Sequence, residues 1–184
     1  DVLSICRTLG KGFEEFILLD MGLDYSMMTI FQSGAPVAQR ALQQGWGNFV
    51  NAVAEVTGTD NRKAESLITT KNLLIDGDND FEEASVALKE AVNSLVHECR
   101  LTSDYYTTNK REAVFTHLVL AGAGSAVPGL SEYVARDNEN EVITHDILKT
   151  VDFSSKFEKT KVKAAAPVLA VAVGAALGGG DFDD

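Results

Sequence analysis

A short acidic turn near the beginning of the chain contains residue types that could bind a phosphate together with a magnesium ion. It runs from Asp20 to Ser26, includes Gly22, Asp24 and Tyr25, and separates two apolar runs. Backbone N–H groups beside a glycine can approach a phosphate closely. A neighbouring aspartate can hold a hydrated Mg²⁺ ion, which keeps several of its waters. The same residues also suit an ordinary hairpin turn, and this motif alone favours that simpler interpretation.

A glycine-rich turn, Gly122-Ala123-Gly124-Ser125, is the second candidate for a nucleotide site. It separates an apolar run from a predicted helix, and a turn of this kind before a helix N-terminus is typical of nucleotide binding. The dinucleotide fingerprint would need a third glycine at the position of Val127, so an NAD-dependent oxidoreductase is disfavoured. The serine does not stand in a Gly-x-Ser-x-Gly motif, which disfavours a hydrolase.

The remaining residues that could bind metals or act as nucleophiles are scattered. The histidines and cysteines lie far apart in the sequence: His97, His117, His145, Cys6 and Cys99. We predict no metal site among them and expect two buried, reduced thiols. The acidic segment Asp76–Asp80 resembles a calcium loop, but Phe81 and Ala87 occupy the positions where an EF-hand requires Gly and Glu.

The composition narrows the classes of partner. The chain has 184 residues, with 16 Lys and Arg against 27 Asp and Glu, for a net charge of −11. Nucleic acids and anionic membrane surfaces are therefore poor partners. The longest apolar run, Ala164–Leu177, contains Pro167 and is shorter than the roughly 20 residues that span a bilayer. We interpret it as a buried helix and expect no direct membrane insertion.

Hydrophobic patterning predicts an α/β fold with a mixed five-stranded sheet flanked by helices. Three strands at the beginning form a meander, and two strands follow later in the chain: Phe16–Asp20, Ser26–Phe31, Val37–Leu42, His117–Ala121 and Val142–Thr144. A turn is expected at Gln32–Pro36.

Helices are predicted in the other segments. The first begins at a cap formed by Asn48 and reaches about Val56, and the others are Asn61–Ile68, a long helix from Phe81 to about Tyr106, a helix that starts at Pro128, and Lys161–Leu177. The long helix should span about 40 Å, the diameter of a small domain.

The order of these motifs resembles a known family. An Asp-x-Gly hairpin at Asp20, a Gly-x-Gly-Ser-x-x-Pro-Gly-Leu turn at 122–130 and an Ala-rich closing helix at 164–177 resemble the second half of the actin-like ATPase (ribonuclease H-like) fold. The resemblance is greatest to the PilM family of type IV pilus assembly, relatives of the cell-division protein FtsA. It extends over nearly the whole chain.

The resemblance implies a division of the chain. Residues 1–15 would be the end of an interdomain helix, and residues 16–70 with 111–180 would form subdomain 2A. Residues 71–110 would form a reduced subdomain 2B dominated by the long helix, and 181–184 a flexible tail. The chain does not begin with Met, and we expect a C-terminal fragment without the family's first phosphate loop. Such a fragment should not hydrolyse ATP on its own.

The resemblance also implies a ligand and a set of binding residues. ATP and Mg²⁺ would bind in the full-length protein, and weakly or not at all in this fragment. Asp20 would hold the metal through a water. Phosphate and adenosine would contact residues of the two turns and of the second helix: Gly22, Asp24, Tyr25, Ser26, Glu65, Gly122, Ala123, Gly124 and Ser125.

The partner implied by the family is the N-terminal cytoplasmic segment of a PilN-type inner-membrane protein, together with other pilus assembly proteins. The chain would be a cytoplasmic scaffold, recruited to the inner membrane through these partners, and not an enzyme.

Three positions differ from the family pattern. Ala123 replaces the middle glycine of the adenosine turn, Ile68 replaces a lysine that Lys71 does not restore, and Tyr25 is bulky. These differences predict weak nucleotide affinity. The alternatives are a type II secretion or cell-division relative, half of a sugar or acetate kinase, and a nucleotide-free interaction module.

Overall fold

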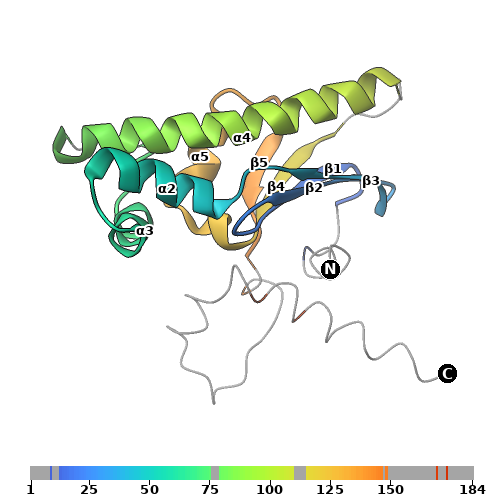
Figure 1. Cartoon of the computed structure of the whole chain (residues 1–184). Coiled ribbons are helices and arrows are strands. Elements are labelled where there is room, and N and C mark those ends of the chain that lie inside the picture. The colour runs from blue at the N-terminus through green and yellow to red at the C-terminus, as the bar shows by residue number, and fades with distance from the viewer. Residues whose placement is uncertain are drawn as a thin grey trace, which may run out of the picture.

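A mixed five-stranded sheet lies at the centre of the structure, with the strands in the order β3-β2-β1-β4-β5 (Figure 1). The computed structural model describes residues 13–75, 79–109 and 115–146, together with Leu9, Leu148, Leu169 and Val173. The strands are β1 Phe16–Met21, β2 Ser26–Gln32, β3 Ala35–Leu42, β4 His117–Ala121 and β5 Glu141–Thr144. β1, β2 and β3 pair antiparallel, whereas β4 is parallel to both β1 and β5. The predicted α/β fold with a mixed sheet is confirmed.

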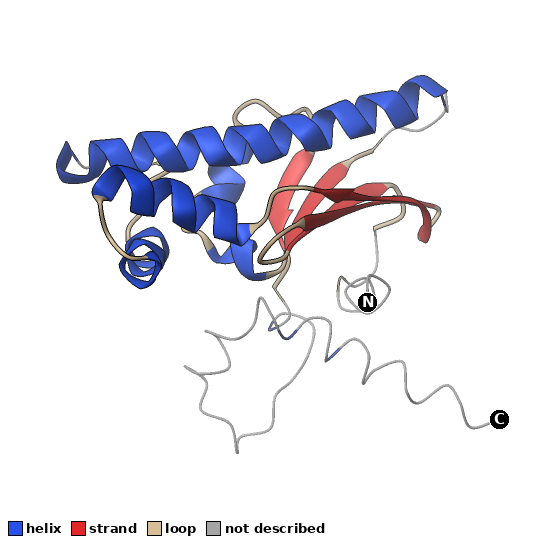
Figure 2. Cartoon of the chain, viewed as in Figure 1, coloured by secondary structure: helices blue, strands red, loops and turns tan. Residues whose placement is uncertain are grey.

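Helices cover one face of this sheet. They are α2 Trp46–Thr57, α3 Asn61–Thr70, α4 Glu82–Asn109 and α5 Leu130–Ala135. Figure 2 shows α4 running above the other helices and the strands along the whole length of the described structure (Figure 2). At 28 residues, α4 is about 42 Å long, and it ends three residues beyond the predicted Tyr106.

The hydrophobic core consists of two clusters, one on each face of the sheet, because successive side chains of a strand point to opposite faces. Ile17, Leu19 and Met21 of β1 pack with Phe49 of α2 and Leu88 of α4 in the larger hydrophobic cluster. The intervening residues of β1 point to the opposite face. There Phe16 stacks on Phe31 with ring centroids 4.5 Å apart. This smaller cluster also contains Leu18, Val119 and Ala121, with Leu9, Phe13, Ile143, Leu148 and Val173 packed against it. β1 is therefore buried on both faces, as its continuous apolar run predicts.

The ends of several elements differ from the predictions. The turn between β2 and β3 consists only of Ser33 and Gly34, which both have positive φ, as in a type I′ hairpin. Pro36 lies inside β3, where a missing N–H is tolerated because β3 is an edge strand. Asn48 is not the cap of α2. Gly45 is the cap, and the Asn48 side chain accepts a hydrogen bond from its N–H at 2.8 Å.

The two helices predicted in the last third of the chain differ in how much of them the structure describes. Pro128 does not begin a helix, because it lies in the turn that precedes α5 and Gly129 is the capping residue. Of the predicted last helix, only Leu169 and Val173 are described, both in helical conformation. The tail 181–184 and most of residues 1–15 lie outside the described residues.

Candidate functional site

The two candidate loops begin at the same edge of the sheet. β1 and β4 are parallel, and Asp20 is directly opposite Ala121. Because parallel strands end at a common edge, the hairpin after β1 and the turn after β4 lie side by side, the usual place for a ligand in an α/β sheet. The hairpin is the segment Gly22–Tyr25, and the turn is the 3₁₀ segment η2, Ala123–Ala126, preceded by Gly122.

Asp20 lies where the two loops meet. It is half-buried in β1, and burial raises the pKa of its carboxyl above the ordinary value of 3.8. A Cβ atom at Gly122 would collide with the Asp20 carboxylate and would lie 2.6 Å from the Met21 carbonyl oxygen. Gly122 also has φ +79° and ψ −179°, a backbone conformation that is essentially confined to glycine. The turn after β4 can therefore pass directly over the end of β1 only because residue 122 is glycine.

The turn after β4 is closed and buried. The Ser125 hydroxyl donates to the Gly122 carbonyl at 2.7 Å, and Ser125 is only 4% exposed. A Cβ atom at Gly124 would lie 2.8 Å from the Met21 Cβ. The middle residue, Ala123, is half-buried. The Ser125 hydroxyl is thus used within the turn, and its predicted contact with adenosine would have to be made by other atoms of the residue.

The hairpin after β1 is held from the other side by the start of α2. The backbone N–H of Trp46 donates to the Gly22 carbonyl at 2.7 Å, and the backbone N–H of Gly47 donates to the Leu23 carbonyl at 2.8 Å. The Ser26 hydroxyl, which is fully buried, donates to the Gln44 carbonyl at 2.7 Å. The Ser26 hydroxyl therefore positions the hairpin, and a contact of Ser26 with phosphate stays a prediction.

The side chains at the tip of the hairpin are exposed, although its backbone is fixed. Leu23 is 63% exposed and Tyr25 is 52% exposed, and Asp24 between them is also exposed. The positioning role of residues 44–47 is not apparent from the sequence. The available signal is the pair of glycines around Trp46, which allows two chain segments to approach closely.

The second helix carries one predicted binding residue and one core residue. Glu65 lies in the middle of α3 with an exposed side chain, and its contact with a nucleotide stays a prediction. Ile68 is completely buried in the larger hydrophobic cluster, so this position serves the core. The ammonium group of Lys71 lies 5.2 Å from the centroid of the Phe81 ring and does not replace the lysine that the family pattern has at position 68.

The described residues contain no group of three or more His, Cys, Asp or Glu side chains that could hold a metal ion. Asp20 is a single carboxylate, and a single carboxylate suits an ion that keeps most of its waters, as Mg²⁺ does. His145 follows β5 at the same edge of the sheet and is 7% exposed. Its backbone N–H donates to the Leu120 carbonyl oxygen at 2.8 Å. Cys99 is buried as predicted, and burial raises the pKa of its thiol to about 12.

In the described part of the chain, no helix is both long enough and apolar enough to cross a membrane.

Comparisons with known proteins identify the fold. The family model described as type IV pilus assembly protein PilM matches residues 7–179. The solved structure of a PilM-PilN type IV pilus biogenesis complex is similar with a TM-score of 0.75 and 21% identity, covering 97% of this chain and 49% of that chain. Curated protein sequences give no significant match.

Two other solved structures extend the likeness to further actin-like proteins. MreB5 of Spiroplasma citri bound to ADP has a TM-score of 0.63 at 13% identity, with 95% of this chain and 56% of that chain covered. The ethanolamine utilization protein EutJ from Carboxydothermus hydrogenoformans has a TM-score of 0.61 at 15% identity, with 94% and 52% covered. The predicted actin-like fold is confirmed, and this chain spans about half the length of the structures it matches.

Proposed function

This chain belongs to the family of type IV pilus assembly protein PilM, and we propose that it serves that assembly system as a nucleotide-binding scaffold and not as an independent ATPase. One observation carries the nucleotide role. The turn at Gly122 crosses the end of β1 against the Asp20 carboxylate, so two loops of the kinds that bind phosphate and nucleoside share one edge.

ATP with Mg²⁺ fits the residues at this edge. Asp20 would hold the ion through a water, and the backbone of Gly22–Tyr25 would approach the phosphates. The backbone of Gly122–Gly124 would face the adenosine. The ion would neutralise phosphate charge, and it would also favour the ionised form of a carboxyl whose pKa burial raises. The similarity to an ADP-bound MreB5 supports this assignment.

The partner that we propose is the N-terminal segment of a PilN-type protein. The support is the similarity to the PilM chain of a PilM-PilN complex. Through such a partner the chain would work at the cytoplasmic face of the inner membrane. The PilM chain of that complex is about twice as long as this chain, so we expect this chain alone to hold only part of the nucleotide contacts and to bind weakly.

A nucleotide-free interaction module is the second candidate. It is favoured by the core position of Ile68 and by the internal hydrogen bonds of the Ser26 and Ser125 hydroxyls. Each of these side chains serves packing or loop closure in the structure.

Amide NMR during a titration with millimolar ATP, with and without Mg²⁺, separates the two candidates. We expect shifts confined to Gly22–Ser26 and Gly122–Ser125. Asp20→Asn should weaken the Mg²⁺-dependent binding about tenfold, the effect of losing one charged contact. Because the pKa of Asp20 is raised, this Mg²⁺-dependent part should fade on acidification at a higher pH than an ordinary aspartate would allow.

The control is Asp104→Asn, which changes an exposed carboxylate of α4 and should leave the titration unchanged. If millimolar Mg-ATP shifts no amide of either loop, the nucleotide contacts proposed for this chain are wrong and the interaction module remains.

A further inference from the structure

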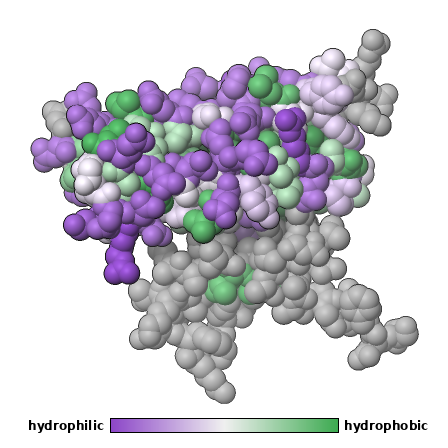
Figure 3. Space-filling view, in the orientation of Figure 1, coloured by the Kyte–Doolittle hydropathy of each residue, from purple (hydrophilic) through white to green (hydrophobic). Residues whose placement is uncertain are grey.

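An open groove lies between α2 and the first half of α4, on the helical layer and apart from the sheet edge. Its volume is about 540 Å³, and it is lined by Val56 of α2 and by residues of α4: Glu82, Glu83, Val86, Ala87 and Glu90. Val56 is 43% exposed and Val86 is 50% exposed, although valine is usually buried. Figure 3 shows apolar surface between hydrophilic side chains at the end of the molecule where α2 and α4 lie together (Figure 3).

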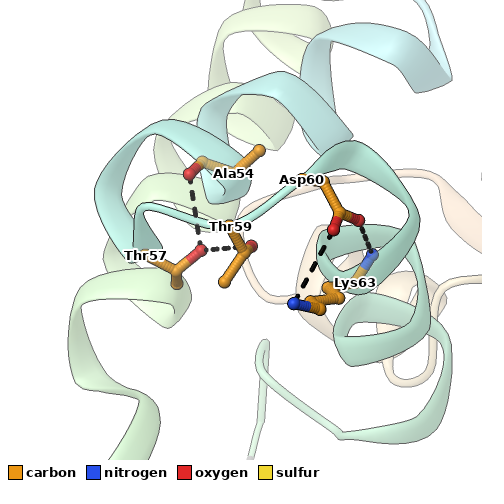
Figure 4. A network of polar contacts seen from close by, with 5 residues as sticks. All are labelled: Ala54, Thr57, Thr59, Asp60 and Lys63. Carbon is orange, nitrogen blue, oxygen red and sulfur yellow. Dashed lines mark hydrogen bonds and ion pairs between the residues drawn. The ribbon is translucent and has the colours of Figure 1, made fainter.

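The walls of the groove are fixed in place. Below it, Val53, Ala84 and Leu88 are fully buried in the larger hydrophobic cluster. The end of α2 is stopped by Gly58 in the left-handed conformation. The following turn is held by a hydrogen bond between the Thr57 and Thr59 hydroxyls at 2.9 Å and by the Asp60 side chain, which accepts from the Lys63 N–H at 2.9 Å (Figure 4). The groove is thus part of the packed structure, and a ligand would find it already formed.

The groove carries negative charge beside its apolar floor. Three of its six lining residues are glutamates with exposed side chains, and none is basic. Glu55, next to Val56, is exposed as well. Lys63 lies 3.7 Å from the Asp60 carboxylate and Lys71 lies over the Phe81 ring, and neither lysine lines the groove. Lys89, on the same helix, is half-buried and does not line the groove.

We propose that this groove docks a basic amphipathic segment of a partner protein, whose apolar side chains lie on Val56 and Val86 while its Lys or Arg side chains pair with the glutamates. Opposite charges around an apolar floor provide both specificity and rapid association. Nucleic acids and anionic membranes do not suit a groove lined by three carboxylates. The proposal is independent of the nucleotide role, because no residue of the groove belongs to the sheet edge.

Fluorescence anisotropy with a labelled synthetic helix of Leu and Lys, whose Leu residues form one face, tests the proposal on the full 184-residue chain. We expect Glu83→Gln combined with Glu90→Gln to weaken binding about tenfold at low salt and to flatten its salt dependence. Val86→Ser should weaken binding and leave the salt dependence intact. A peptide with the same Lys residues but Ser in place of Leu should bind poorly.

The matched control is Glu132→Gln with Glu139→Gln, which removes the same charge from exposed positions in α5 and the loop after it. An equal loss of affinity in this control would overturn the proposal, because binding would then follow the total charge. Unchanged binding in the groove variants would also overturn it. Carbodiimide cross-linking should join the peptide lysines to Glu83 or Glu90. Cross-links confined to other carboxylates would contradict the proposal, and so would self-association of the protein through the groove. Thermal melting confirms that each variant is folded.

Discussion

The hairpin Gly22–Tyr25 and the turn Gly122–Ala126 leave the same edge of the sheet, yet they differ in what holds them in place. The hairpin is held by hydrogen bonds from the start of α2 to its carbonyl oxygens, and its tip exposes Leu23 and Tyr25. The turn is held by close packing, because Gly122 and Gly124 lie where a Cβ atom would collide with β1.

This difference predicts how each loop tolerates change. A loop fixed through its backbone can vary its exposed side chains, so the hairpin can change residues 23–25 while its position stays the same. The turn cannot accept a side chain at Gly122 or Gly124 without moving away from β1. The turn should therefore determine whether the edge forms, and the hairpin should determine what the edge recognises.

Gly122→Ala should give the largest effect. The new methyl group would force an unfavourable backbone conformation and collide with Asp20 and Met21, which together should cost about 3–4 kcal/mol of unfolding free energy. Urea denaturation measures the loss. Gly34→Ala is the matched control, because Gly34 also has positive φ but has nothing within 4 Å of the new Cβ. It should cost about 1 kcal/mol, and an equal loss in both variants would show that the turn is not held by packing.

Ser26→Ala should give an intermediate effect. It removes a buried hydrogen bond between segments 18 residues apart, so the free energy of unfolding should fall by about 1–2 kcal/mol. Ser125→Ala removes a hydrogen bond within one turn and should cost about 0.5–1 kcal/mol. If Ser125→Ala proved the more damaging in the same urea titration, hydrogen bonds and not packing would hold the turn.

Asp20→Asn should give the smallest effect, with the opposite sign. Burial raises the pKa of Asp20 in the folded state above its ordinary value of 3.8. Folding therefore favours the protonated form, and the ionised carboxylate reduces stability at neutral pH. Removing the charge should therefore raise the free energy of unfolding slightly at neutral pH.

The pH dependence provides the check on this sign. The difference in unfolding free energy between Asp20→Asn and the wild type should shrink as the pH falls through the folded-state pKa of Asp20, because the wild-type carboxyl then becomes neutral too. Asp24→Asn, at an exposed position of the hairpin, should change stability by less than about 0.5 kcal/mol. A loss of stability in Asp20→Asn at neutral pH would mean that the carboxylate is satisfied in the folded protein.

The strands and their order along the chain could be predicted from the sequence because burial leaves a direct pattern. β1 begins with the uninterrupted apolar run 16–19, and the prediction for His117–Ala121 has the bounds that the structure has. The element ends could not be predicted so well. Asn48 has the chemistry of a cap, but Gly45 holds that position because the hairpin occupies the N–H groups of Trp46 and Gly47.

The candidate site shows the same limit. Asp20 and Gly122 could be proposed as site residues through the family resemblance and not from their residue types alone, and their contact follows from the parallel pairing of β1 and β4. The buried hydroxyls of Ser26 and Ser125 could not be distinguished from free ones, since their acceptors are backbone carbonyls that carry no sequence signal. Glu65 and Ile68 lie on one short helix, and only the structure shows that Ile68 is in the core while Glu65 is on the surface.

α2 has a consequence for signalling through the molecule. Its first residues bind the hairpin at the sheet edge, and Val56, near its last residue, lines the acidic groove. The helix has 12 residues, so its two ends are about 18 Å apart, with a packed core along its length. A displacement of the hairpin would therefore reach the groove only as a movement of the whole helix, since α2 is packed along its length.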